Sequence, residues 1–488
     1  MLRYDIKKLN IVQKMTKALK KDVFVVFFWK SEKEVPMINL ITHGYVITVN
    51  KSFAIYKDGA VAYEGDRILD IGDSEDLEKK YEGAKRFDAK GMAVMPGLIN
   101  THLHSGLIRG TAEDMPVFEW LALHVDPAHK VLTADDAEIA SKVCYSESLL
   151  AGTTTVVDMY RYMHRCADSA EETGIRAIMA PYVGDRPGYD YFEKIDDNEI
   201  LFKERNNSAD GRVKVWFGLE HIAYCSEDAY RRVAKLAEKY DTGIHTHGEE
   251  SITMVNMIKK KYGCDPIKLF YDRGILGPKT LIAHCCWINP YEIEILRATG
   301  TSIAHCPISN MKLASGICPV TDSLRAGVAV GVASDGIKEN NSVDLFEEMK
   351  FASLLQKLGR LDASVMTAEE TIKLATIYGA RAVGMEDEIG SLEIGKKADI
   401  IMVDLRKLHL SPYLTNDYAN IVANLAFSAN GADVDTVIVN GDTRVLHRKL
   451  LTEDIDALME RYTAATEALI ERRRPYVPES VSINNIEL

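Results

Sequence analysis

The stretch Val94-Met-Pro-Gly-Leu-Ile-Asn-Thr-His-Leu-His104 is the strongest local signal in the sequence, and the rest can be read outward from it. It reads as an extended, largely apolar segment that ends on His102 and His104. In an extended segment, residues i and i+2 point to the same side, so both imidazoles can aim at one point just past the strand end. Neutral imidazole is a good ligand for Zn²⁺ or Fe²⁺. A lone His-x-His pair is weak evidence, so the other strand ends must support it.

Polar residues also end three other apolar runs. Ile244-His-Thr-His-Gly-Glu-Glu250 offers the imidazole of His247 and the carboxylate of Glu250, the run before His284 ends on that imidazole, and Val330-Gly-Val-Ala-Ser-Asp335 ends on a carboxylate. A buried histidine with only a packing role is plausible for each run singly. It is implausible for the whole set, because buried ionisable groups without partners are costly.

The middle of the chain, over residues 92–390, alternates strands with helical stretches. The eight strand candidates are Met92–Pro96, Thr153–Asp158, Arg176–Pro181, Val213–Gly218, Gly243–His247, Thr280–His284, Ser302–His305 and Val328–Asp335. This number and length predict an α/β fold of the (β/α)₈ TIM-barrel type. All strands of such a barrel end at one face, where active sites lie, so the His and Asp residues should meet there.

The flanks of this middle region read differently. Residues 37–91 and 391–446 are short strands with Gly and Asp turns, which predicts one small β-sandwich domain built from both flanks. Residues 447–488 form a C-terminal helix and tail, with a helix expected over Thr452–Arg474, capped by Thr452 and stopped by Pro475. Residues 1–36 form an N-terminal extension with nine Lys and Arg against four Asp and Glu.

Composition narrows the class of protein. The net charge is −13, and without the basic extension the remainder carries −18, which argues against a nucleic-acid or anionic-membrane partner. The eight cysteines are scattered without a CxxC pair, which is typical of reduced thiols in the cytoplasm, and we expect none to bind metal. The apolar run Val23–Trp29 is too short to span a bilayer, and its surroundings do not predict an export signal.

The His102–His104 segment resembles the first metal motif of the amidohydrolase superfamily. The similarity continues in order through His247 with Glu250, His284, the run from His305 to Gly316, and Ser334-Asp-Gly, and it closes with Ile389-Gly-Ser-Leu-Glu-Ile-Gly-Lys-Lys-Ala-Asp-Ile400. It covers about Met37 to Leu446. Within the superfamily, the chain is similar to methylthioadenosine/S-adenosylhomocysteine deaminases and s-triazine hydrolases.

The resemblance assigns roles to individual residues. It implies one divalent metal per chain, Zn²⁺ or alternatively Fe²⁺, held by His102, His104, His247 and Asp335. Glu250 and His284 match the proton-handling pair, with Asp335 taking the proton from water. The fourth strand ends Leu219-Glu-His221 without the lysine that two-metal relatives carboxylate, which favours a single metal.

Two further residues resemble substrate contacts of the family. Glu119 matches a glutamate that binds ribose hydroxyls in nucleoside deaminases, although an acidic residue at a helix start also has a dipole explanation. His221 matches a histidine at the substrate rim, although it could instead support other site residues. Lys338 and Glu339 depart from the pattern, because small residues are usual at these positions in nucleoside deaminases.

These residues predict a hydrolytic deaminase acting on a nitrogen heterocycle, with an adenine nucleoside such as methylthioadenosine or adenosine favoured. The alternatives are an s-triazine amino- or chlorohydrolase, a guanine- or pterin-type deaminase, a two-metal cyclic-amide hydrolase and a non-catalytic scaffold. The expected partner is a small heterocyclic molecule. Homologues suggest a dimer or larger assembly, but no residue here specifies one.

Overall fold

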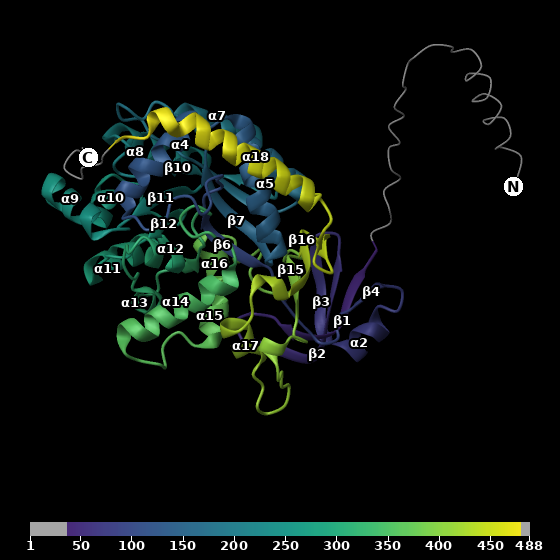
Figure 1. Cartoon of the computed structure of the whole chain (residues 1–488). Helices are drawn as coiled ribbons and strands as arrows, with labels where there is room; N and C mark the ends of the chain where they lie inside the picture. The colour runs from purple at the N-terminus through teal and green to yellow at the C-terminus, as the bar shows by residue number, and fades with distance from the viewer. Residues whose placement is uncertain (1–36, 480–488) are drawn as a thin grey trace, which may run out of the picture. The chain divides into compact units, whose positions relative to one another are not determined.

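The computed structural model describes residues 37–479 and has an α/β architecture built on parallel sheets (Figure 1). The extension expected over residues 1–36 and the end of the tail, residues 480–488, lie outside the described residues. Within residues 37–479, no helix combines the length and the apolar character that crossing a bilayer requires.

Two parallel sheets occupy the middle of the chain. The four-stranded sheet runs β6 (Leu98–Leu103), β7 (Thr153–Tyr160), β8 (Arg176–Pro181) and β9 (Val213–Val215). The five-stranded sheet runs β10 (Phe217–Leu219), β11 (Ile244–Gly248), β12 (Thr280–His284), β13 (Ser302–His305) and β14 (Val330–Val332). These strands are buried almost throughout, as expected for parallel sheets that are covered on both faces.

The strand predicted over Val213–Gly218 is split at Trp216. The Trp216 amide donates to the Met179 carbonyl at 2.9 Å, whereas the Phe217 amide donates to the Gly243 carbonyl at 2.9 Å, so the chain passes from one sheet to the other here. At the opposite edges, β14 lies beside β6. The Thr101 hydroxyl donates to the Val332 carbonyl at 3.0 Å, and the Asp335 amide donates to the His102 carbonyl at 3.1 Å. This pairing brings the first and last parts of the site together.

A nine-stranded mixed sheet combines both flanks of the chain. Its strands are β1 (Asn39–Ile47), β2 (Ile55–Glu64), β3 (Arg67–Asp73), β4 (Lys85–Asp88), β5 (Met92–Pro96), β15 (Ile400–Asp404), β16 (Val434–Val439), β17 (Asp442–Leu446) and β18 (Lys449–Leu450). The flanks meet where β5 pairs antiparallel with β15. The expected strand over Met92–Pro96 therefore forms, but assigning it to the barrel was wrong. The first strand of the parallel sheets is β6, after Gly97.

Helices connect the strands of the parallel sheets. They are α3 (Val117–Trp120), the π-helical turn η1 (Leu121–Val125), α4 (Asp126–Val131), α5 (Ala134–Leu150), α6 (Met163–Thr173), α7 (Ile195–Arg205), α8 (Glu227–Tyr240), α9 (Ile252–Tyr262), α10 (Pro266–Asp272), α11 (Pro290–Thr299), α12 (Pro307–Lys312), α13 (Val320–Ala326), α14 (Leu345–Arg360), α15 (Ala368–Leu374) and α16 (Ile377–Ala382). Two more, α2 (Ser74–Lys80) and α17 (Ile421–Phe427), belong to the flanks.

The C-terminal helix α18 (Ile455–Arg473) lies along α4 and α5 (Figure 1). Its cap is Asp454, whose carboxylate accepts from the amides of Asp456 and Ala457, so the predicted cap at Thr452 was wrong. The Tyr462 and Thr466 hydroxyls donate to the carbonyls of Gly106 and Leu107 at 3.0 and 2.7 Å. The helix thus holds the loop that follows His104.

Candidate metal centre and active site

Four side chains from three strand ends converge at one point. His102 and His104 come from the end of β6, His247 from β11, and Asp335 from just beyond β14. The Nε2 atoms of His104 and His247 are 3.1 Å apart, and Asp335 Oδ1 lies 3.3 Å from His102 Nε2 and 3.4 Å from His104 Nε2. All four side chains are buried. The structure therefore brings together every residue that the sequence nominated as a metal ligand.

Hydrogen bonds fix which nitrogen of each imidazole carries the proton. His104 Nδ1 donates to the Met159 carbonyl at 2.6 Å, and His247 Nδ1 donates to the Glu220 carbonyl. His102 is oriented by a relay, in which its Nδ1 donates to His245 Nε2 at 2.7 Å while His245 Nδ1 donates to the Leu281 carbonyl at 2.9 Å. Because each Nδ1 holds the proton of a neutral ring, each Nε2 of the three converging histidines presents a lone pair.

This arrangement fits a divalent cation. Burial lowers the pKa of His102, His104 and His247, which keeps the rings neutral. Two Nε2 lone pairs then face each other, and the buried His102 Nε2 has no hydrogen-bond partner. Three imidazoles with one carboxylate match the donor preference of Zn²⁺ and Fe²⁺, and all three imidazoles have an Nδ1–H partner of the kind that orients ligating histidines.

His245 was missed as a contributor to the site from the sequence. It lies two residues before His247, so strand alternation turns both side chains to the same side, and this signal was available. We expect His245→Ala to weaken zinc binding by about 10- to 100-fold, because His102 would lose the acceptor that orients its ring. Competition with a chromogenic chelator measures this affinity.

His305→Ala is the matched control for His245→Ala. His305 is also a buried histidine, on strand β13 of the same sheet, but its ring nitrogens have no hydrogen-bond partner among the described residues. The control should keep zinc affinity within about threefold of the original protein. Equal losses in both variants would contradict the orienting role of His245.

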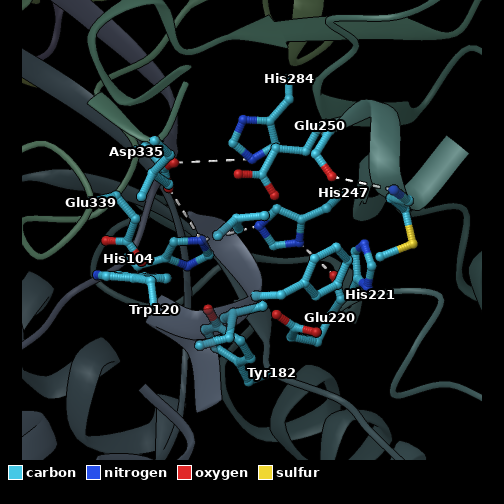
Figure 2. A pocket seen from close by; sticks show the side chains of 16 residues that line it. His104, Trp120, Tyr182, Glu220, His221, His247, Glu250, His284, Asp335 and Glu339 are labelled. Carbon is cyan, nitrogen blue, oxygen red and sulfur yellow. Dashed lines mark hydrogen bonds and ion pairs between the residues drawn. The ribbon is translucent and has the colours of Figure 1, made fainter. Parts of the chain in front are cut away.

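Glu250 and His284 lie beside the converging ligands (Figure 2). The Ser315 hydroxyl donates to Glu250 Oε1 at 3.3 Å, and burial raises the pKa of the Glu250 carboxyl. His284 Nδ1 donates to Asn310 Oδ1 at 2.9 Å, while its Nε2 lies 4.0 Å from Asp335 Oδ2. Burial alone would lower the pKa of His284, but the carboxylates of Glu250 and Asp335 raise it.

Asp335 is held in place by contacts to its second oxygen and its backbone. The Ser309 hydroxyl donates to Asp335 Oδ2 at 2.6 Å, and Asp335 adopts a left-handed φ of 62°. Burial alone would raise the pKa of Asp335, but the adjacent imidazoles of His102, His284 and His104 lower it well below its ordinary value. An ionised carboxylate therefore faces the Nε2 atoms of His102 and His104.

A cavity of about 40 Å³ opens beside these groups, with Phe118, Trp120 and Tyr182 among its apolar walls. His221 lines it, as expected of a residue at the substrate rim. Glu119 does not line it, although Val117, Phe118, Trp120 and Leu121 do. On a helical turn these four side chains cover one side and Glu119 points to the other. Its Oε2 is buried there without a hydrogen-bond partner.

The cavity also contains acidic groups that the sequence did not place at the site. Glu220, at the end of β10, lines the cavity together with Glu250, Asp335 and Glu339. Burial and the charge of Asp126 raise the pKa of Glu220 well above its ordinary value. Glu339 Oε1 lies 2.5 Å from Lys338 Nζ, so these two departures from the nucleoside-deaminase pattern form a buried ion pair at the site.

Comparison with known proteins agrees with this geometry. The model of the amidohydrolase family matches residues 93–444. The chain belongs to the amidohydrolase family. Members of this family are metal-dependent hydrolases, which agrees with the convergence of three imidazoles and a carboxylate at one site.

Individual members of the family are similar to this chain over most of its length. The chain is 37% identical over 441 residues to 5-methylthioadenosine/S-adenosylhomocysteine deaminase of Pelotomaculum thermopropionicum, covering 89% of this chain and all of that protein. A zinc-bound adenosine deaminase from Xanthomonas campestris is 29% identical with a TM-score of 0.85, covering 89% of this chain and 99% of that one. A zinc-bound variant of atrazine chlorohydrolase from Arthrobacter aurescens is 23% identical with a TM-score of 0.81, covering 88% and 100%, and shares the fold.

Proposed function

We propose that this protein is a metal-dependent deaminase that hydrolyses the exocyclic amino group of an adenine nucleoside such as methylthioadenosine or adenosine. The observation that carries the proposal is the convergence of three Nε2 lone pairs and Asp335 beside Glu250 and His284. The 37% identity to a nucleoside deaminase over nearly the whole chain supports this class of substrate.

His102, His104, His247 and Asp335 would hold the metal. A bound Zn²⁺ or Fe²⁺ supplies positive charge that lowers the pKa of water toward neutrality. Asp335 is ionised and accepts a proton from the attacking water. Glu250, whose carboxyl has a raised pKa, donates a proton to a ring nitrogen and makes the attacked carbon more electrophilic. His284, whose Nδ1 donates to Asn310 and whose pKa the nearby carboxylates raise, donates a hydrogen bond from Nε2 to the entering oxygen in its imidazolium form.

The reaction balances with water as the only co-reactant. The water oxygen bonds to the carbon that carries the amino group, and the proton held by Asp335 passes to the departing nitrogen. The carbon–nitrogen bond then breaks and ammonia leaves. The second water proton, left on the added hydroxyl, passes to Glu250 and restores it, so the ring nitrogen keeps its proton and the product has a ring carbonyl. We propose a single metal, because Glu220 and His221 stand where two-metal relatives have a lysine. We propose Zn²⁺ as this metal.

Four further proposals concern the architecture, the compartment and the assembly. We propose that the two parallel sheets close into one (β/α)₈ barrel over residues 92–390, with β5 excluded from the barrel. Two sets of contacts support this closure: those of Trp216 and Phe217, and those between β14 and β6. The nine-stranded sheet would fold into a β sandwich of residues 37–91 and 391–446, with 447–488 as helix and tail. Scattered thiols support action in the cytoplasm, and a homo-oligomer is proposed from the family resemblance alone.

A substrate panel tests the proposed function. The zinc-loaded protein is incubated with methylthioadenosine, adenosine, guanine, a pterin, an amino-s-triazine and a chloro-s-triazine, and ammonia and chloride are measured. We expect ammonia release with the adenine nucleosides highest in kcat/KM. Absence of ammonia from every aminopurine would contradict the nucleoside assignment, and chloride or triazine turnover alone would favour the triazine alternative.

A further inference from the structure

Glu220 is a buried carboxylate of the cavity that the proposed chemistry does not use. Its side chain is 5% exposed and its Oε2 has no hydrogen-bond partner. Among the described residues, no hydrogen bond or ion pair involves its carboxyl group. Only its backbone takes part, through the amide that donates to the Val183 carbonyl and the carbonyl that accepts from His247. A buried carboxyl group without a partner is costly to ionise, so its charged form calls for a positively charged partner.

The other acidic groups of the cavity are already matched. Asp335 faces the histidine cluster and Ser309, Glu250 accepts from Ser315, and Glu339 pairs with Lys338. None of the described residues that line the cavity is a lysine or arginine. Figure 2 shows Glu220 on the side of the His104 and His247 rings that is opposite Glu250 and His284. The described residues thus leave the Glu220 carboxyl group open to a partner supplied by the ligand, away from the reacting end.

The wall around Glu220 favours a positive charge over a neutral donor. Tyr182 lines the same cavity, and its aromatic ring brings no positive charge to this wall. Glu220, Glu250, Asp335 and Glu339 together bring four carboxyl groups to the lining, and the described lining residues include no lysine or arginine, so an anionic substituent finds no such counter-charge there.

We infer that Glu220 is a specificity-determining residue that selects heterocycles carrying a cationic substituent, such as a protonated primary amine, which it binds at the wall shared with Tyr182. This inference rests on the proposed function and specifies its substrate class. The contact is a charge-assisted hydrogen bond from the ammonium group to the Glu220 carboxylate, formed in a site from which water is largely excluded.

Three adenine probes of equal reach test the inference. They are 9-(3-aminopropyl)adenine, 9-(3-hydroxypropyl)adenine and 9-(2-carboxyethyl)adenine, which present a cation, a neutral donor and an anion. For the zinc-loaded protein we expect kcat/KM for the amine to exceed that for the alcohol by about tenfold or more, with the carboxylate lowest. In Glu220→Gln, which keeps the shape and removes the charge, the ratio of amine to alcohol should fall to about one.

Glu238→Gln is the control, because Glu238 is an exposed residue of α8 and its substitution changes net charge equally. It should retain the original ratio. The inference is overturned if the original protein does not prefer the amine, if Glu220→Gln retains the preference, or if Glu220→Gln loses bound zinc.

The experiment also separates failure of the inference from failure of the proposed function. If no adenine probe releases ammonia, the proposed function fails, and the dissociation constants of the same three probes are then measured by calorimetry. The inference still requires the amine to bind more tightly than the alcohol, and Glu220→Gln to remove that difference. Equal affinities in the original protein would overturn it.

Discussion

Replacing Glu250 by Gln should lower kcat by about 10²- to 10⁴-fold while the protein keeps its metal. The amide has the size of the carboxyl group and can still accept from Ser315, but it cannot deliver a proton to a ring nitrogen. Burial raises the pKa of the Glu250 carboxyl, which is the property an acid needs near neutral pH. The initial rate of ammonia release with saturating adenine nucleoside measures the effect.

Zinc content and thermal midpoint, measured on the same sample, separate lost chemistry from lost structure. Both should match the original protein, because Glu250 is not among the converging ligand atoms. Turnover within about fivefold of the original would contradict the acid role of Glu250. A loss of activity accompanied by loss of zinc would show instead that Glu250 helps to hold the metal.

Replacing His247 by Ala should remove the metal and lower activity by at least about 10³-fold. His247 supplies one of three Nε2 lone pairs, and its ring is oriented by the Glu220 carbonyl. Without it, the remaining donors are two imidazoles and a carboxylate, which no longer match the tetrahedral preference of zinc. Elemental analysis of the dialysed protein and the rate of ammonia release are the measurements.

His164→Ala provides the matched control for His247→Ala. His164 is half-exposed on α6 and pairs with Glu204 at the surface, so its loss removes an imidazole without touching the site. This variant should retain full zinc and at least half of the activity. Full zinc occupancy in His247→Ala would contradict the assignment of His247 as a ligand.

The sequence was sufficient to locate the ligand cluster because simple geometry links strand ends to one face. Alternation in β6 predicted that His102 and His104 share a side, and parallel pairing brought His247 and Asp335 to them. Strand alternation could have placed His245 on the side of His247, but its contact with His102 depends on how β6 and β11 face each other, which no local pattern encodes. Glu220 was overlooked as a lining residue for the same reason.

The sequence-based predictions differ from the structure in two further places, where the local sequence pattern fits more than one arrangement. A five-residue apolar run such as Met92–Pro96 predicts a buried strand but not its sheet, and the partner β15 lies some 300 residues away in sequence. The sequence similarity around Glu119 predicted that this residue contacts the substrate. In the structure, its neighbours Phe118 and Trp120 on α3 line the cavity, and Glu119 points to the other side of the helix. Contact between Glu119 and substrate stays a prediction.

Zinc titration of the metal-free protein tests the central claim most directly. The chelated and dialysed protein receives increasing zinc while bound metal and ammonia release from an adenine nucleoside are recorded together. A single-metal deaminase predicts no turnover without metal, a linear rise, saturation at one zinc per chain, and one ammonia for each deaminated product. Saturation only at two zinc ions per chain, or full occupancy without ammonia release from any aminopurine, would contradict it.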